Sequence, residues 1–328
     1  MSDLGSTARG LDRMLPRLGK HPKKVDPRTL QLARYLTPEL PAPPPSCDYS
    51  VKLSTLGMMA NDRVGDCTCA AAGHIVQDAT SYEGAQVVVP DADVLAMYSA
   101  VSGYDPVTGA NDNGAACLDV LNYWHQTGFA GPQGPHKIAA FAELGLVSSA
   151  IQTAVYLLGA AYIGVNLPLT CQGASSWEVP PGGTAGNGAP GSWGGHCVPI
   201  VAYDATGVTV LTWGEKLHAS WEFLATYMDE AYAVVTQDFV DAQGTDPAGL
   251  DLTQMLADAA ALGTSPVPAP APALSCWQRF LRRIRRATVG GVRQGMFLAG
   301  LLALSLLMLP VVFVLAMGPR TLPQRRTG

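Results

Sequence analysis

A cysteine at the head of a run of small residues is the feature that most limits how this chain can fold. Gly65-Asp66-Cys67 is followed by Cys69 and by Ala70-Ala71-Ala72. Such small side chains suit close packing, so the segment from 66 to about 79 is predicted to be a helix inside a core. The N-terminus of a helix favours negative charge, and therefore favours the thiolate form of a cysteine in its first turn.

A second motif places a histidine at the start of an apolar strand. Gly194-Gly195-His196-Cys197-Val198 leads into a strand ending at Tyr203, and 208–213 would pair with it as a hairpin. A nearby histidine lowers the pKa of a cysteine and acts as its general base. Cys67 and His196 are therefore the candidate nucleophile and base of a catalytic site.

An amide side chain before the cysteine could complete that site. Acyl transfer through a thiolate needs hydrogen-bond donors for the oxyanion that develops in the transition state. The side chain of Asn61 and the backbone N–H of Cys67 meet this requirement. Asn61 is therefore the candidate oxyanion donor.

These motifs resemble those of papain-like cysteine peptidases, over roughly residues 55–240. The order of the blocks agrees: the cysteine block, then Asn113-Gly114, then His196, a strand and Trp213-Gly214. The chain is also similar to bacteriocin-processing relatives, in which an Asp-Cys pair opens the central helix. It further resembles uncharacterised phage and bacterial proteins that share its Asp-Glu-Ala-Tyr sequence at 229–232. The resemblance implies an α+β fold, in which a central helix carrying the cysteine packs on an antiparallel sheet carrying the histidine.

The chain departs from the papain-like pattern at two positions. The family carries Gln where Asn61 stands, and Asn is one methylene shorter. The family residue that orients the histidine aligns with Leu211, which cannot accept a hydrogen bond. Thr212 takes that place if the hairpin is one residue shorter, and Asp204 in the turn is the other candidate. A catalytic dyad without its third member still works, more slowly.

The composition limits which cofactors and partners are expected for this chain. The chain has seven cysteines, and no apolar secretory segment lies within residues 1–24, so reduced thiols are expected and no disulfide is assigned. Cys67 and Cys69 lack a second pair at zinc spacing, so neither a metal nor a cofactor is expected. The net charge is -5, and the charged residues after Cys276 are all arginines. The acidic body that remains argues against nucleic acid as a partner.

The C-terminal region has the composition of a membrane anchor. Residues 296–317 are 22 consecutive residues without a charge, which as a helix span about 33 Å and can cross a bilayer. A proline-rich spacer and a basic amphipathic segment precede them. Arginine is denser before the span than after it, which favours a single-pass C-terminal anchor with the large domain in the cytoplasm.

The predicted organisation has seven parts, with a few further elements inside the main domain. The parts are a polar Pro-rich arm (1–46), the papain-like domain (47–243), a peripheral helix (244–262), a Pro/Ala linker (263–275), a basic juxtamembrane segment (276–295), the transmembrane helix (296–317) and a basic tail (318–328). Further predicted elements are a strand at 86–89, helices at 92–101, 115–127, 151–158 and 221–227, and strands at 161–166 and 231–235. Nothing in the sequence decides whether the arm acts as a propeptide.

Two functions follow from these features. The first is a membrane-anchored thiol hydrolase that cleaves peptide or isopeptide bonds in a peptide or protein substrate through a Cys-His acyl-enzyme. The alternative is a catalytically inactive papain-like domain that serves as a membrane-tethered binding module or a virion-associated structural module. Intact Cys67 and His196 favour the first function, and Leu211 favours the second.

Overall fold

The computed structural model describes residues 16–130, 135–237 and 249–264. The predicted linker from residue 265 on, the juxtamembrane segment, the transmembrane helix at 296–317 and the basic tail lie outside the described residues, whereas residues 263 and 264 belong to a helix. Within the described ranges, no helix is both long enough and apolar enough to span a bilayer.

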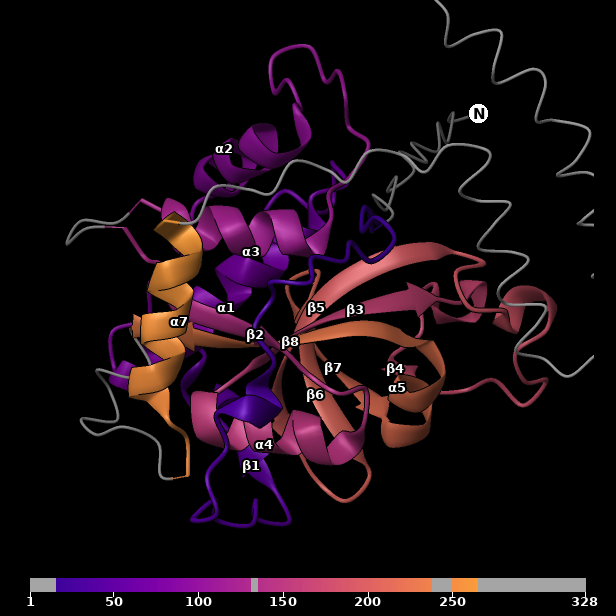
Figure 1. The fold of residues 1–328 in the computed structure, drawn as a ribbon. Coiled ribbons are helices and arrows are strands. Elements are labelled where there is room, and N and C mark those ends of the chain that lie inside the picture. Colours follow the sequence, from indigo (N-terminus) through magenta and orange to yellow (C-terminus); the bar gives the residue numbers. More distant parts are fainter. Residues whose placement is uncertain (1–15, 131–134, 238–248, 265–328) are drawn as a thin grey trace, which may run out of the picture. The chain divides into compact units, whose positions relative to one another are not determined.

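A sheet with helices packed on it forms the described structure (Figure 1). The helices are α1 (Cys67–Glu83), α2 (Asp91–Ser102), α3 (Cys117–Gln126), α4 (Ser148–Leu158), α5 (Trp221–Tyr227) and α7 (Leu252–Thr264). The strands are β1 (Cys47–Asp48), β2 (Ile138–Glu143), β3 (Ala161–Leu167), β4 (Ser176–Trp177), β5 (Gly194–Tyr203), β6 (Gly207–Thr212), β7 (Glu215–Ser220) and β8 (Met228–Thr236). The strand order is β2-β8-β3-β5-β6-β7-β4, with β1 paired to β5, and every pairing except β4 with β7 is antiparallel.

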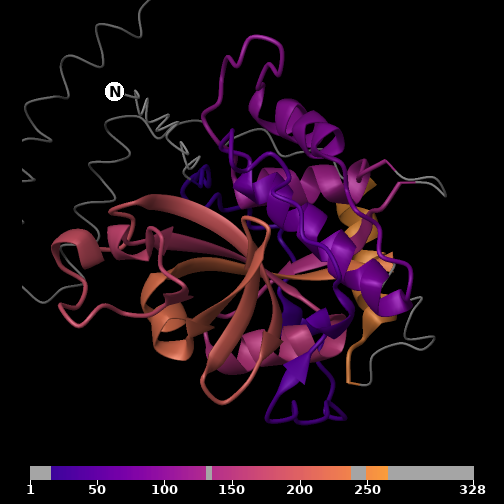
Figure 2. The same ribbon diagram turned by 180° about the vertical axis from the view of Figure 1, so that it is seen from behind.

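The central strands are mostly apolar on both faces, because both faces of the sheet are covered. Side chains alternate between the two faces of a strand. Along β3, Tyr162 belongs to the hydrophobic cluster formed with α1, α2 and α3, whereas its neighbour Ile163 belongs to the cluster formed with α4 and α5. Figure 1 and the reverse view in Figure 2 show these two groups of helices on different sides of the strands.

Helix α1 is buried along most of its length, as its small residues predict. All residues from Cys67 to Ser81 are buried, and Tyr162 on β3 donates a hydrogen bond from its hydroxyl to the Thr68 carbonyl at 2.8 Å. The helix ends at Gly84, whose φ of 101° lies in the left-handed region that glycine adopts without strain. The sheet therefore fixes the position of the helix, and with it the position of Cys67.

Most of the predicted elements are present, with one correction. The hairpin of β5 and β6, the helix at 221–227 and the strand at 161–166 form close to where the sequence placed them. The predicted strand at 86–89 is wrong: this segment pairs with no strand. The side chain of Gln86 instead forms hydrogen bonds with the backbone of Ser54 and Thr55. Val89 is buried in the hydrophobic cluster that includes α1.

Candidate active site

The start of α1 and the start of β5 bring Cys67 and His196 into the same region. Cys67 is the first residue of α1 and is 1% exposed, and His196 lies in β5 and is 0% exposed. A backbone hydrogen bond from Cys197, the neighbour of His196, reaches the Cys67 thiol. The two side chains are not hydrogen bonded to each other, because Nδ1 of His196 has no hydrogen-bond partner among the described residues.

Thr212 and two tryptophans hold the imidazole of His196. Its Nε2 shares a 2.8 Å hydrogen bond with Oγ1 of Thr212. The ring of Trp213 stacks on it at 4.5 Å between centroids, and Trp177 meets it edge-on at 6.2 Å. Trp213 adopts a left-handed φ of 49°, a strained conformation for a bulky residue that costs on the order of 1–3 kcal/mol. Such strain is typical of functional sites, and here it coincides with the stacking on the histidine.

A bulge in the hairpin explains why the polar partner of His196 is Thr212. Ala202 pairs with Thr209, but Ile200 pairs with Val210, so the register shifts by one residue between these pairs. Residues opposite one another share a face, and a one-residue shift exchanges the two faces of a strand. The shift therefore puts Thr212 on the face of His196, whereas an unshifted hairpin would have put Leu211 there.

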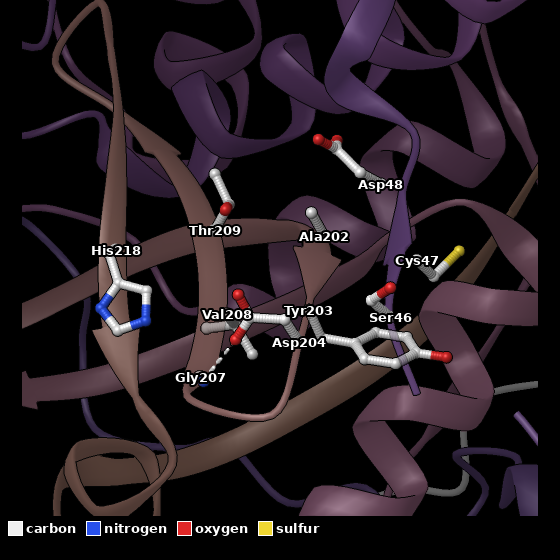
Figure 3. A pocket seen from close by; sticks show the side chains of 10 residues that line it. All are labelled: Ser46, Cys47, Asp48, Ala202, Tyr203, Asp204, Gly207, Val208, Thr209 and His218. Carbon is white, nitrogen blue, oxygen red and sulfur yellow. Dashed lines mark hydrogen bonds between the residues drawn. The ribbon is translucent and has the colours of Figure 1, made fainter. Parts of the chain in front are cut away.

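Asp204, the other candidate partner of His196, belongs to the turn between β5 and β6. Its Oδ1 accepts hydrogen bonds from the backbone N–H groups of Thr206 at 2.7 Å and Gly207 at 3.1 Å. It lines a separate pocket of about 250 Å³, together with His218 (Figure 3). The carboxylate is thus used to build the turn, and Asp204 is not the hydrogen-bond partner of His196 in this structure.

Asn61 lies close to the cysteine, but its amide hydrogens bond to its own loop. Its Nδ2 donates to the Val64 carbonyl at 3.2 Å and to Oδ1 of Asp66 at 3.1 Å. Burial raises the pKa of Asp66 well above its usual value, and the hydrogen bond from Asn61 offsets part of that shift. In the state described, Asn61 supports the loop that leads into α1, and an oxyanion would have to compete for its donors.

The surroundings of Cys67 and His196 favour the neutral forms of both side chains. The pKa of Cys67 is raised to about 12, chiefly by burial and in part by the nearby Cys117 and Asp66, although backbone hydrogen bonds from Cys197 and Gly19 act in the opposite direction. Burial and the proximity of His74 lower the pKa of His196 to about 3. A thiolate–imidazolium pair is therefore not formed in this state.

Residues 17–21, which we call the strap, pack against this region. The strap runs between the loop before α1 and the start of β5 and is held by backbone hydrogen bonds to both and to Ala115, which precedes α3. These are Arg17 N–H to Asn61 O at 3.0 Å, Ala115 N–H to Gly19 O at 2.8 Å, Lys20 N–H to Gly195 O at 3.1 Å and His21 N–H to Ala115 O at 3.0 Å. With Gly19 also bonded to the thiol, the strap covers Cys67.

Glycines on both sides of the strap allow this close approach. A Cβ atom added to Gly19 would lie 1.8 Å from the carbonyl oxygen of Gly65, and one added to Gly195 would lie 2.4 Å from the carbonyl oxygen of Lys20. Gly114, at a φ of 87°, would place a Cβ atom 2.0 Å from the carbonyl oxygen of Gly19. Backbone packs directly on backbone here, which only glycine permits.

A hydrogen-bond network that sequence reasoning missed fixes the two loops beside the strap, which are the loop before α1 and the loop before α3. Oδ1 of Asp112 accepts from the Gly65 N–H at 2.8 Å and from the Tyr98 hydroxyl at 2.8 Å. The Tyr98 hydroxyl in turn accepts from the Gly114 N–H at 2.8 Å. The only sequence signal was the position of Asp112 directly before Asn113-Gly114, and no local pattern pointed to Tyr98.

The fold is that of papain-like cysteine proteases. Xylellain, a cysteine protease from Xylella fastidiosa, superposes with a TM-score of 0.52 at 14% identity, covering 67% of this chain and 96% of xylellain. Procathepsin L 3 from the larval midgut of Tenebrio molitor (TM-score 0.45, 12% identity, 65% and 75% covered) and procathepsin B S9 from Trypanosoma congolense (0.47, 11%, 67% and 87%) also match. No protein-family model and no curated sequence matches the chain. The resemblance to bacteriocin-processing and phage proteins stays a prediction.

Proposed function

We propose that the chain is a thiol hydrolase that cleaves peptide or isopeptide bonds. The observation that carries this proposal is the placement of Cys67 at the N-terminus of α1 beside the strand of His196, whose Nε2 is held by Thr212. That arrangement leaves Nδ1 of the imidazole as the atom available to exchange a proton with the thiol. The papain-like fold, which xylellain shares, supports the same chemistry.

The proposed reaction proceeds in two steps. His196 takes the proton of Cys67, the sulfur attacks the carbonyl carbon of the scissile bond, and the imidazolium gives the proton to the departing amine. Water, deprotonated by His196, then attacks the acyl-enzyme, and the carboxylic acid leaves as the proton returns to the sulfur. The Cys67 N–H and the Asn61 amide are the proposed donors to the oxyanion in both steps.

The strap must leave before a substrate can reach the thiol. In the state described, Gly19 occupies the position next to the sulfur, and both reacting groups are buried and neutral. Removing the strap would return water to the site and reduce the burial that holds the pKa of Cys67 high and that of His196 low. The helix N-terminus and the imidazole would then act together to favour the thiolate.

A variant that displaces the strap tests this proposal. Gly19→Ala would place a methyl group against Gly65, whereas Gly182→Ala adds one in open space and serves as the matched control. We expect Gly19→Ala to hydrolyse a quenched fluorescent casein and to react with iodoacetamide at Cys67 below pH 7. Adding Cys67→Ala should abolish hydrolysis, and adding His196→Ala should return alkylation to the rate of an ordinary thiol of pKa about 8.5.

The same experiment distinguishes the alternative. If Gly19→Ala exposes Cys67 to iodoacetamide, but the thiol reacts no faster than a free cysteine and casein stays intact, the domain is an inactive binding or structural module. If Gly19→Ala hydrolyses casein and the added Cys67→Ala abolishes that hydrolysis, the alternative is ruled out.

We further propose that residues 296–317 anchor the protein in a membrane, with the large domain in the cytoplasm. The support is the uncharged 22-residue run and the distribution of arginines around it. Carbonate-resistant sedimentation of the full chain with membranes would support the anchor. Release into the supernatant would contradict it, and digestion of the large domain by protease added outside sealed cells would contradict the orientation.

A further inference from the structure

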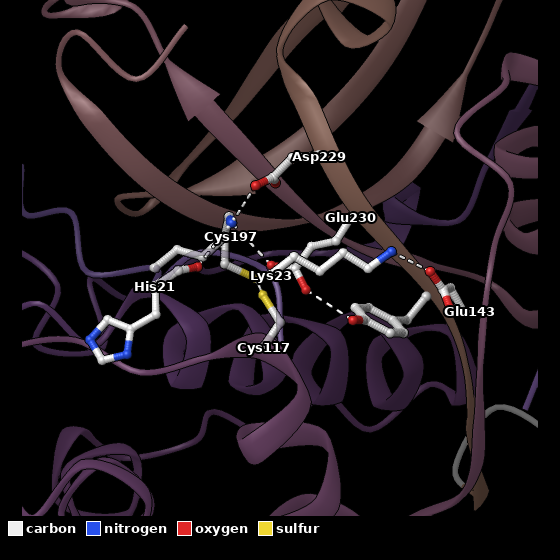
Figure 4. A network of polar contacts seen from close by, with 9 residues as sticks. His21, Lys23, Cys117, Glu143, Cys197, Asp229 and Glu230 are labelled. Carbon is white, nitrogen blue, oxygen red and sulfur yellow. Dashed lines mark hydrogen bonds and ion pairs between the residues drawn. The ribbon is translucent and has the colours of Figure 1, made fainter. Parts of the chain in front are cut away.

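Lys20 in the strap carries a charge that is buried against β3 and β8. Its side chain is 0% exposed, and Nζ lies 2.9 Å from Oδ2 of Asp229 and 3.0 Å from Oε1 of Glu230. The ammonium also donates to the His21 carbonyl at 3.1 Å. In Figure 4 the carboxylate of Glu230 lies beside the thiols of Cys117 and Cys197, and Asp229 lies above them. A lysine is almost never buried in this way unless it is paired.

The pocket that receives Lys20 is part of the sheet and not of the strap. Its wall is β8, which carries both carboxylates, and its floor is Gly164 on β3. A Cβ atom on Gly164 would lie 2.6 Å from Cε of Lys20 and 2.6 Å from Cγ of Glu230, so the missing side chain makes the room. Oε2 of Glu230 accepts a 2.9 Å hydrogen bond from the Tyr232 hydroxyl, which fixes that carboxylate independently of Lys20.

The charges of the pocket call for a cation. Two carboxylates face one ammonium, and Glu230 is 0% exposed. A buried carboxylate without a partner is strongly unfavourable, so the pocket is stable only when a cation or water occupies it. Burial alone would lower the pKa of Lys20, but attraction to Glu230 and the hydrogen bond to Asp229 raise it, so the lysine is held charged.

The pocket lies beside the reacting atoms. The backbone of Gly19 bonds to the Cys67 thiol, and the N–H of the next residue, Lys20, bonds to the carbonyl of Gly195, the neighbour of His196. A peptide that follows the track of the strap therefore places a side chain in this pocket when its backbone lies at the sulfur.

We propose that the pocket formed by Gly164, Asp229 and Glu230 is a specificity pocket for a lysine or arginine side chain of the substrate, and that Lys20 occupies it in place of substrate. The inference rests on the proposed hydrolase function for its meaning, but the pocket can be tested by binding alone. Arginine suits the two carboxylates as well as lysine does, because its guanidinium donates in several directions at once.

Peptide binding to a chain with an emptied pocket tests the proposal. In the full-length Gly19→Ala, Lys20→Ala variant, which displaces the strap and empties the pocket, a fluorescein-labelled Leu-Gly-Lys-His peptide (the sequence 18–21) and its arginine and norleucine versions are compared by anisotropy. We expect the lysine and arginine peptides to bind at least about tenfold more tightly than the norleucine peptide, the size expected for a charge-assisted hydrogen bond. When Glu230→Gln is added to this variant, the preference should disappear. Equal binding of all three peptides, or no binding to the folded variant, overturns the proposal.

A small-molecule rescue provides the second measurement. Lys20→Ala removes a propylammonium group, so n-propylammonium chloride should raise the melting temperature of this variant and leave the unsubstituted chain unchanged at equal ionic strength. The uncharged isostere n-propanol should not raise it, and rescue by both compounds alike would contradict a cation pocket. If Lys20→Ala does not fold, the peptide comparison is made on Lys20→Met, which keeps the apolar stem.

The binding result and the hydrolase result are separable. Charge-selective binding with an unreactive Cys67 would mean that the pocket exists in an inactive module. Hydrolysis of casein by Gly19→Ala without any preference for basic residues would support the hydrolase function and contradict the proposed specificity pocket.

Discussion

Nε2 of His196 lies 2.8 Å from the hydroxyl oxygen of Thr212, and this hydrogen bond fixes one edge of the imidazole. If Nδ1 is the base, Nε2 carries a proton in both the neutral and the protonated imidazole and donates to the hydroxyl oxygen in both, so the bond survives proton transfer. It carries no charge, however, and stabilises an imidazolium less than a carboxylate does. Thr212 therefore orients His196 more than it stabilises the positive charge of the imidazolium.

Removing that hydroxyl should impair both the base and the fold. Thr212→Val keeps the shape of the side chain and leaves a buried imidazole nitrogen unpaired, which costs about 1–3 kcal/mol. We expect a melting temperature lower by roughly 2–4 °C for each kcal/mol, and hydrolysis in the strap-displaced background slower by about tenfold. Calorimetry and casein hydrolysis measure the two effects. Thr212→Ser, which keeps the hydroxyl, should restore most of both.

The sequence predicted the two motifs but could not predict which hairpin residue faces the histidine. Cys67, His196 and the intervening Asn-Gly block are local patterns, and the structure places Cys67 at the start of α1 and His196 near the start of β5. The choice between Leu211 and Thr212 depends on the bulge between Ile200 and Ala202. A residue count along the strand does not show where such a bulge forms.

The strap was unpredictable for a different reason. Residues 17–21 lie in a polar, proline-punctuated arm with no periodicity, and their partners are Asn61, Ala115 and Gly195, far away in the chain. Nothing local distinguishes Lys20 from a solvated lysine, since its burial depends on two acidic residues more than 200 positions later. Non-local pairing of this kind becomes visible only once the chain has folded.

Asp66 should make the stability of the fold depend on pH. Because burial raises its pKa well above 3.8, the folded state keeps a proton that the unfolded state has already lost. Stability contributed by Asp66 is therefore complete below pH 3.8 and is lost as the pH rises toward the folded-state pKa. We expect Asp66→Asn to be more stable than the unsubstituted chain at pH 7, and this advantage to vanish below about pH 4. Urea unfolding at several pH values measures the difference, and a gain that is independent of pH would contradict a buried, protonated Asp66.

The Tyr98 hydroxyl should contribute to stability through the loops beside the strap. Tyr98→Phe leaves the Gly114 N–H without its acceptor and removes one donor to Asp112, so a loss of about 1–3 kcal/mol is expected. The same change should loosen the strap, because Gly114 and Gly65 lie against Gly19. Hydrogen exchange at 17–21 and urea unfolding report the two effects. Unchanged exchange at the strap with lower stability would confine the network to a structural role.

Asn61 can be tested by comparing two reactions of the same thiol. Hydrolysis passes through an oxyanion, whereas alkylation by iodoacetamide displaces iodide and forms none. In the strap-displaced background, Asn61→Ala should slow casein hydrolysis by about 100-fold, the usual effect of losing one oxyanion donor, and change the alkylation rate of Cys67 by less than about twofold. Loss of the bonds to Val64 and Asp66 should also lower the melting temperature. Equal slowing of both reactions would instead mean that Asn61 acts only by holding the loop before Cys67. Unchanged hydrolysis would leave the Cys67 N–H as the sole donor assigned to the oxyanion.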